Sequence, residues 1–186
     1  MASGYVDLPH DTYSVWKNAT LGNEYDLDGA YGCQCWDYAS LFWRNVGFGV
    51  GYPLTGPQQY ASECWTVSRE SNKGDQFDLI YNLNDVKTGD IIVLNGNISN
   101  PPGHIAFADE DYGGGAYIWA IGQNQGGTPS PSGGTAVTRN QLGVGDFLGA
   151  FRYKAWHEVP PTPTLTKTKF PWVLYARKLN QRRNQV

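Results

Sequence analysis

Short apolar or alternating runs, separated by turn-forming residues, occupy the second half of the chain. Such runs predict strands when Gly, Pro and Asn bound them. The turn-rich segments between them include residues 112–115 (YGGG) and 126–129 (GGTP). The expected strands are Phe77–Tyr81, Asp90–Leu94, His104–Ala108, Ala116–Ile121 and Phe147–Tyr153.

Helical patterns come before these strands. His10–Leu21 predicts a short helix, and Cys35–Val46 has apolar residues at helical spacing, with Gly47 as a stop signal. Pro57–Trp65 predicts a third helix, with proline in its first turn. Helices followed by a meander of strands indicate the α+β class, with N-terminal helices packed on an antiparallel β-sheet.

A Pro/Thr stretch at residues 159–164 (VPPTPT) predicts an extended linker. Residues 1–158 then form one domain. Residues 165–186 are too few to fold alone and fit the start or remnant of a wall-binding or structural module. The net charge is −3, yet this tail carries Lys and Arg without any acid. It either contacts a polyanion or is a solvated terminus, and both interpretations stay open.

The composition, 40% hydrophobic and 17% charged, is that of a globular domain. No run approaches the about 18 apolar residues of a membrane span. The first residues have neither a basic start nor an apolar run, so we expect no signal peptide and folding in a cytoplasm. The three Cys are an odd number, which argues against a disulfide framework.

A candidate nucleophile lies where a Gly-containing loop enters the second predicted helix. A helix N-terminus and a nearby imidazolium both stabilise a thiolate, so Cys35 is well placed to react. His104, at the start of a predicted strand, is the candidate base. Asn124, just past the next strand, is the candidate for the third residue that orients the imidazole ring.

Four segments together resemble the CHAP domain (cysteine, histidine-dependent amidohydrolase/peptidase) of bacteriophage lysins and bacterial wall hydrolases. They are residues 31–37 (YGCQCWD), 89–93 (GDIIV), 103–106 (GHIA) and 123–124 (QN). The resemblance implies a papain-like fold, with Cys35 as nucleophile, His104 as base and Asn124 as orienting residue. We expect the Cys35 N–H and the Gln34 side chain to hold the oxyanion.

One position departs from this resemblance. Relatives often carry Glu where this chain has Gly122. The triad is left intact, but a possible fourth contributor is missing, and the pH optimum stays open.

The loop before the nucleophile predicts a calcium site. Asp26 and Asp28 alternate beside Gly29, and Asp37 lies just past Cys35. Hard carboxylate and carbonyl oxygens are the ligands that Ca²⁺ prefers. The resemblance implies carboxylate ligands from Asp26, Asp28 and Asp37 and carbonyl ligands from Ala30 and Gly32. The alternative is that these acids form Asx turns and cap the helix.

The expected function is hydrolysis of an amide bond in peptidoglycan, by an endopeptidase or an N-acetylmuramoyl-L-alanine amidase. The resemblance implies a Gram-positive wall, with the protein released from the host cytoplasm through a holin or carried on a virion tail. A wall polyanion is the partner considered for the tail, and no nucleic acid is expected.

Three other interpretations fit parts of the sequence. The related NlpC type of wall peptidase usually has Ser after its Cys and a second His as orienting residue, whereas Trp36 follows Cys35 here. A virion tail or wall-binding protein would keep the fold with little or no catalysis. A zinc site would use Cys33, Cys35, Cys64 and His104, a poor spacing for zinc.

Overall fold

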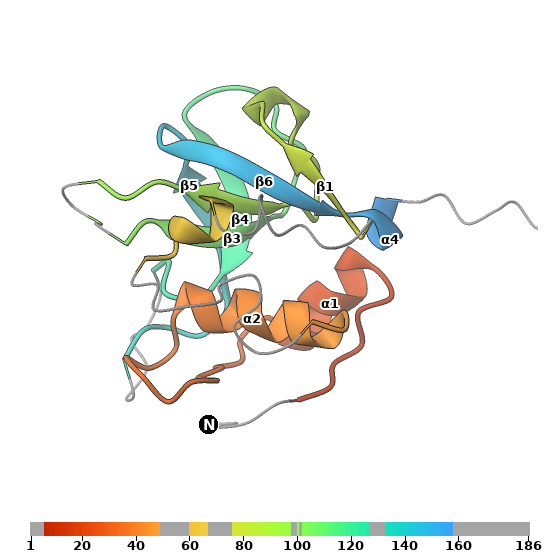
Figure 1. Ribbon diagram of the computed structural model, residues 1–186, viewed down its shortest axis with the longest axis vertical. Helices are drawn as coiled ribbons and strands as arrows, with labels where there is room; N and C mark the ends of the chain where they lie inside the picture. Colours follow the sequence, from red (N-terminus) through yellow and green to blue (C-terminus); the bar gives the residue numbers. More distant parts are fainter. Residues whose placement is uncertain are drawn as a thin grey trace, which may run out of the picture.

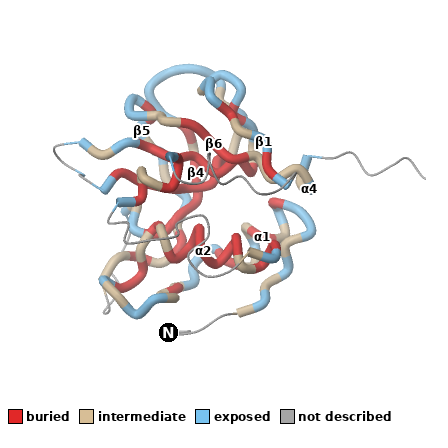
Figure 2. Tube along the Cα trace, viewed as in Figure 1, coloured by how far each residue is buried: buried red, intermediate tan, exposed pale blue. Residues whose placement is uncertain are grey.

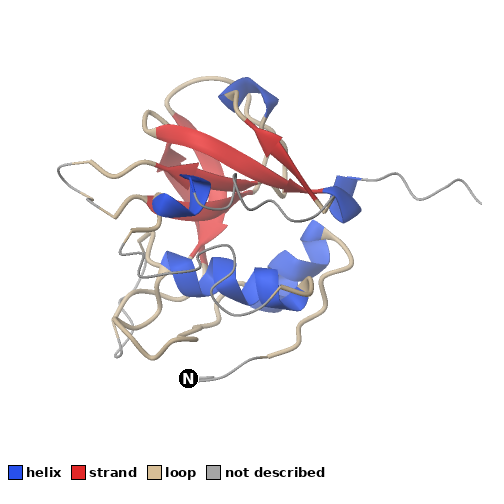
Figure 3. Ribbon diagram, viewed as in Figure 1, coloured by secondary structure: helices blue, strands red, loops and turns tan. Residues whose placement is uncertain are grey.

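Two helices pack on one face of a six-stranded antiparallel sheet in the computed structural model of the protein (Figures 1 and 3). The predicted linker and tail, 159–164 and 165–186, lie outside the described residues. The structure describes residues 6–48, 60–66, 76–97, 100, 102–126 and 133–157.

The two helices that pack on the sheet precede all the strands, as the sequence pattern predicts, whereas a short helix follows the last strand. Neighbouring strands follow the order β1-β6-β2-β3-β4-β5, and every pair is antiparallel. The elements are α1 (Tyr13–Thr20), α2 (Cys35–Asn45), β1 (Phe77–Ile80), the 3-10 helix η1 (Leu83–Asp85), β2 (Ile91–Leu94), β3 (His104–Ala108), β4 (Tyr117–Gly122), β5 (Thr138–Gly143), β6 (Phe147–Tyr153) and α4 (Lys154–His157). The α+β prediction is confirmed.

Strand β5 escaped the sequence pattern. Its residues, TRNQLG, alternate between half-buried and exposed, and none is fully buried. It lies at the edge of the sheet and pairs with β4 alone. A strand without an apolar face gives no hydrophobic signal, so its pairing partner rather than its composition defines it. Part of the predicted third helix is seen at residues 63–66, while residues 57–59 lie outside the described part.

An aromatic core joins the helices to the sheet. Phe107 of β3 packs against Tyr38 and Phe42 of α2, with ring centroids 5.1 and 5.3 Å apart. Trp16 of α1 packs against Phe42 at 5.2 Å. Figure 2 shows the buried residues concentrated along α2 and the central strands. Aromatic pairs of this kind stabilise by about 0.5–1.5 kcal/mol beyond the area that they bury, and they set where α2 lies on β3.

The opposite face of the sheet carries a smaller apolar cluster. Ile92 and Ala150 lie at its centre, on adjacent strands β2 and β6, and Ile118 comes from β4. Every residue of β2 is therefore buried, which is typical of a strand covered on both faces. No helix of the described residues is long and apolar enough to cross a membrane.

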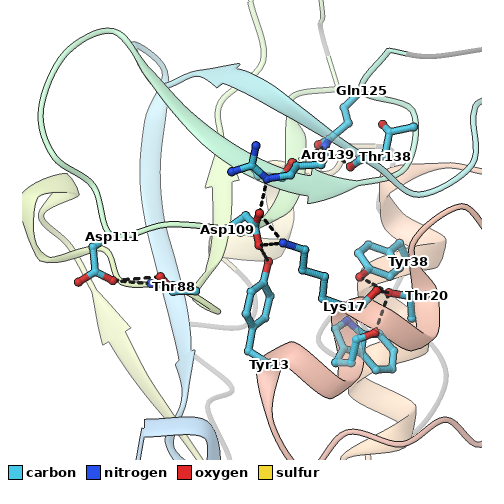
Figure 4. Close-up of polar contacts among 12 residues, drawn as sticks. Tyr13, Lys17, Thr20, Tyr38, Thr88, Asp109, Asp111, Gln125, Thr138 and Arg139 are labelled. Atoms are coloured by element: carbon cyan, nitrogen blue, oxygen red, sulfur yellow. Dashed lines mark hydrogen bonds and ion pairs between the residues drawn. The ribbon is translucent and has the colours of Figure 1, made fainter.

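One carboxylate ties α1 to the sheet. Asp109, directly after β3, accepts hydrogen bonds from Tyr13 Oη at 2.8 Å and Lys17 Nζ at 2.6 Å, and also from Arg139 Nε (Figure 4). Burial raises the pKa of Asp109, but the hydrogen bonds from Lys17, Arg139 and Tyr13 outweigh it and hold this pKa below its ordinary value. Arg139 also lies 4.2 Å from the Trp119 ring centroid.

We predict that Asp109→Asn lowers the free energy of unfolding by about 2 kcal/mol, measured by urea denaturation. This loss lies between the value for breaking an exposed ion pair, about 1 kcal/mol, and that for breaking a buried one, about 3–5 kcal/mol. Asp111→Asn is the matched control, because the Asp111–Lys87 pair is exposed on both sides. Equal losses for the two variants would contradict the importance given to Asp109.

Candidate active site

The start of α2 places Cys35 at a sharp turn of the chain. Tyr31 and Gly32 have φ of 62° and 73°, in the left-handed region that reverses the chain before the helix. Gln34 is the N-cap residue with extended backbone, and its N–H donates to Asp37 Oδ2 at 2.9 Å. Cys35 is thus the first helical residue, where unpaired N–H groups favour an anion.

His104 and Cys35 meet across the helix–sheet interface. His104 begins β3 and is 7% exposed, and it lies against Cys35, which is 8% exposed, closely enough for each side chain to shift the pKa of the other. Burial opposes a thiolate, but the charge and hydrogen bond of His104, with N–H groups of Ile105 and Trp36, lower the pKa of Cys35. Burial likewise opposes an imidazolium, but Cys35 and Gln125 raise the pKa of His104. The geometry therefore favours a thiolate–imidazolium pair.

The contact predicted between Asn124 and His104 is made instead by the next residue. His104 Nε2 lies 3.1 Å from Gln125 Oε1, which leaves Nδ1 as the ring nitrogen for Cys35. Asn124 has φ of 54° and its side-chain N–H donates to Gln34 Oε1 at 2.7 Å. This left-handed residue turns the chain, so that Asn124 faces the start of α2 while Gln125 reaches back toward β3.

The Gln34 amide, predicted to bind the oxyanion, belongs to the residue next to Cys35. Its Nε2 donates to Tyr31 O at 2.7 Å and its Oε1 accepts from Asn124. The orientation of this amide is thereby fixed, and Nε2 carries a second N–H beyond the one that binds Tyr31. Its role toward an oxyanion stays a prediction.

Gln123 is a structural link whose role the sequence analysis did not predict, although it belongs to one of the segments that carry the resemblance. Its amide is fully buried, accepts from Tyr25 N at 3.1 Å and donates to Tyr25 O at 2.8 Å. It also donates to Gln34 O at 3.3 Å. Gln123 therefore joins the end of β4 to the loop that leads into α2.

A cleft of about 370 Å³ opens beside His104. Amide side chains form much of its wall, namely Asn95, Asn97, Asn100, Asn124 and Gln125. Such groups both donate and accept, which suits the N–H and C=O groups of a peptide. A larger hollow of about 430 Å³ lies at the C-terminal end of α2, beside Asn45 and Lys154, and includes neither Cys35 nor His104.

The acidic loop before α2 brings its three carboxylates together. Oxygens of Asp26, Asp28 and Asp37 lie within 4.8 Å of one another. Asp26 accepts from Gly29 N at 2.9 Å and Asp28 from Ala30 N at 2.7 Å, as Asx turns do. Burial, with the charges of Asp28 and Asp26, raises the pKa of Asp37 to about 6, although N–H groups of Gln34 and Leu27 oppose this.

Three converging carboxylates, one of them buried and hard to ionise, fit a hard divalent cation. The backbone carbonyls of Ala30 and Gly32 remain predicted ligands. Among the described residues this trio is the one group of three or more side chains that could together bind a metal ion. The alternative zinc site of Cys33, Cys35, Cys64 and His104 therefore does not form. Cys33 and Cys64 are fully buried thiols.

Comparisons with known proteins identify the family. The family model of the CHAP domain matches residues 23–124, more than half of the chain. The chain is 34% identical over 116 residues to the D-alanyl-L-alanine endopeptidase of Streptococcus phage B30, covering 62% of this chain. It spans only a quarter of the length of that phage protein.

Among solved structures, the fold resembles endolysin LysIME-EF1, with a TM-score of 0.58 and 22% identity over 80% of this chain and 65% of that one. Ly7917 matches with a TM-score of 0.49 and 18% identity, over 74% of this chain and 60% of that one. The chain belongs to the CHAP-domain family, and its helices on an antiparallel sheet form a papain-like α+β fold.

We predict that the rate at which iodoacetamide alkylates Cys35 changes less between pH 6.5 and pH 8.5 than that of an ordinary thiol, because His104 lowers the pKa of Cys35 against the effect of burial. In His104→Ala the rate should fall roughly 50-fold between pH 8.5 and 6.5, as for a thiol of ordinary pKa. Intact-mass measurements give the rates, and Cys35→Ala corrects for Cys33 and Cys64. A wild-type rate that rises only above pH 8 would refute the ion pair.

Proposed function

We propose that the protein is a cysteine hydrolase that cleaves an amide bond in bacterial peptidoglycan. The observation that carries this proposal is the pairing of two buried residues, Cys35 at a helix N-terminus and His104 beside an amide-lined cleft, each of which shifts the pKa of the other toward its charged form. A nucleophile and base in contact are the minimum for thiol catalysis. Membership of the CHAP-domain family and likeness to a phage endopeptidase support the substrate class.

The reaction follows from the proton positions of the pair. The Cys35 thiolate attacks the scissile carbonyl carbon, while the imidazolium of His104 holds the thiol proton. His104 then gives this proton to the leaving amine as the C–N bond breaks, which leaves a thioester on Cys35. Water, losing a proton to His104, attacks the thioester and releases the carboxylic acid.

The tetrahedral intermediate needs donors for its oxyanion. Helical residue Cys35 offers its backbone N–H, and the Gln34 amide offers its second side-chain N–H. In this proposal Asn124 contributes by holding Gln34 Oε1, which turns the donating end of that amide away from Asn124. Removing one such donor typically costs about 10²–10³ in rate.

An endopeptidase is the first choice between the two bond types, since the phage B30 relative is named as a D-alanyl-L-alanine endopeptidase. N-acetylmuramoyl-L-alanine amidase activity is the second choice. The same likeness supports a phage lysin that acts on a Gram-positive wall, released through a holin or carried on a virion tail. A catalytically silent wall-binding protein is less well supported, because the Cys35–His104 contact is intact.

We propose further that Ca²⁺ binds the carboxylates of Asp26, Asp28 and Asp37. The support is their convergence and the cost of ionising buried Asp37. Asp37 also accepts from the backbone of Gln34, the residue before the nucleophile. An ion at this loop would hold the start of α2 in place, so its removal should reduce both stability and activity.

We predict that Ca²⁺ at 100 times its Kd stabilises the protein by about 2.7 kcal/mol, or about 5–10 °C in Tm. Without Ca²⁺, the pKa of Asp37 is about 6 in the folded protein and about 4 in the unfolded chain. Because the folded state binds this proton more tightly, stability falls as the pH rises from about 4 to 6. The gain from Ca²⁺ should therefore be larger at pH 7 than at pH 5, in scanning calorimetry.

Asp28→Asn separates the metal from the capping interpretation. Asn keeps the side-chain oxygen that accepts from Ala30 N but removes the charge. We expect the Ca²⁺ response to disappear in Asp28→Asn and to persist in Asp85→Asn, an exposed acid outside the trio. An unchanged response in Asp28→Asn would leave only Asx turns and capping for these acids.

We predict that the wild-type protein lowers the turbidity of purified Gram-positive walls and that Cys35→Ala does not. His104→Ala should lose about 10²–10⁴ in rate, the usual contribution of a general base. Analysis of released amino groups and muropeptides identifies the bond. If no wall is cleared although walls still capture the protein, the wall-binding alternative replaces hydrolysis.

A further inference from the structure

The Gln125 amide is held in one orientation beside His104. Its Nε2 donates to two backbone carbonyls, Ala120 O at 3.0 Å and Thr138 O at 2.9 Å. Figure 4 shows Gln125 next to Thr138 of β5. A carbonyl oxygen only accepts hydrogen bonds, so the NH₂ group must face these two strands. The remaining end, Oε1, therefore faces His104 Nε2 at 3.1 Å.

This orientation decides which nitrogen of His104 carries a proton. An amide oxygen can only accept, so Nε2 must be the donor in the Gln125–His104 hydrogen bond. In the neutral ring Nδ1 then has a lone pair toward the Cys35 thiol and can take its proton. The two carbonyls thus fix the amide, and the amide fixes the tautomer that the proposed base requires.

The backbone around Gln125 is also held by β5. Asn140 Nδ2 donates to Gln125 O at 3.0 Å and to Thr138 Oγ1 at 3.0 Å. Strand β5 therefore supplies one carbonyl for the side chain of Gln125 and one amide for its main chain. Both Gln125 and β5 lie beyond residues 23–124, the stretch that the CHAP model matches.

The space that the amide fills lies over Gly122, the buried last residue of β4. The φ of Gly122 lies outside the left-handed region, so its backbone does not require glycine. A Cβ atom at this position would lie 2.6 Å from Gln125 Oε1 and 3.3 Å from Ala106 Cβ. The first distance is too short for a van der Waals contact, so any side chain at 122 displaces the Gln125 oxygen.

We propose that Gln125 is the residue that positions His104, and that position 122 is glycine because the Gln125 amide occupies the space over it. The expected loss of wall hydrolysis rests on the proposed function. The expected change in the reactivity of the Cys35–His104 pair does not depend on it. Gln125 acts through His104 and is a positioning residue, not a catalytic one.

The first test removes the Gln125 amide with two variants, one that keeps the length of the side chain and one that shortens it. Gln125→Met fills similar space but accepts only weakly, and Gln125→Ala empties it. Since the hydrogen bond that His104 donates to Gln125 raises the pKa of His104, both variants should shift the pH profile of Cys35 alkylation toward that of His104→Ala. The maximal rate of wall lysis should fall about 10- to 100-fold, with the half-saturating wall concentration unchanged.

The second test uses the coupling between the two positions. Gly122→Ala should reproduce the loss of Gln125→Ala, because the two atoms nearest to the added methyl group belong to the Gln125 amide. The double variant should be no worse than Gln125→Ala alone, because the amide is removed in both. Gly113→Ala is the control, since this glycine has ordinary φ and open space around it. Calorimetry checks that each variant is folded.

Two outcomes would overturn the proposal. One is a wild-type alkylation profile and lysis rate in folded Gln125→Met and Gln125→Ala. The other is multiplication of the two losses in the double variant, which would make Gly122 and Gln125 independent. If the wild-type protein clears no wall, the proposed hydrolysis fails, but the alkylation profiles still decide the role of Gln125.

Discussion

The packing of α2 against β3 is the constraint on which the reactive pair depends. Cys35 belongs to the helix and His104 to the strand, so their contact exists only while Tyr38 and Phe42 remain seated on Phe107. A rigid aromatic layer is well suited to this task, because displacing one ring leaves a void that its neighbours cannot fill. The aromatic core thus sets the distance between Cys35 and His104. Asp109, at the opposite end of β3 from His104, holds α1 to the same sheet.

The turn after β4 distributes three neighbouring amides to three different places. Gln123 is buried against the loop before α2, Asn124 faces Gln34, and Gln125 reaches His104. This divergence depends on the positive φ of Asn124, a conformation that Asn tolerates better than most residues. One short segment consequently contacts the loop before α2, the Gln34 side chain and the imidazole of His104.

Much of this arrangement could be predicted from the sequence, and the failures have a common cause. Hydrophobic runs located β3 and β6 to the residue, and the loop–helix junction located Cys35, because both signals are local. Strand β5 and Gln125 left no such signal. Their roles come from pairing with β4 and from one backbone angle, which neither polarity nor spacing encodes. The convergence of Asp26, Asp28 and Asp37 could be predicted because they lie close together in the sequence.

The amide of Gln125 above Gly122 also constrains how this site can change by single substitutions. A larger residue at 122 meets an occupied space, while a shorter residue at 125 leaves the imidazole without its acceptor. Either substitution made alone disturbs the contact with His104, and only substitution at both positions fills the space beside the imidazole again. Positions 122 and 125 are therefore expected to change together, because either change alone disturbs the contact that orients His104.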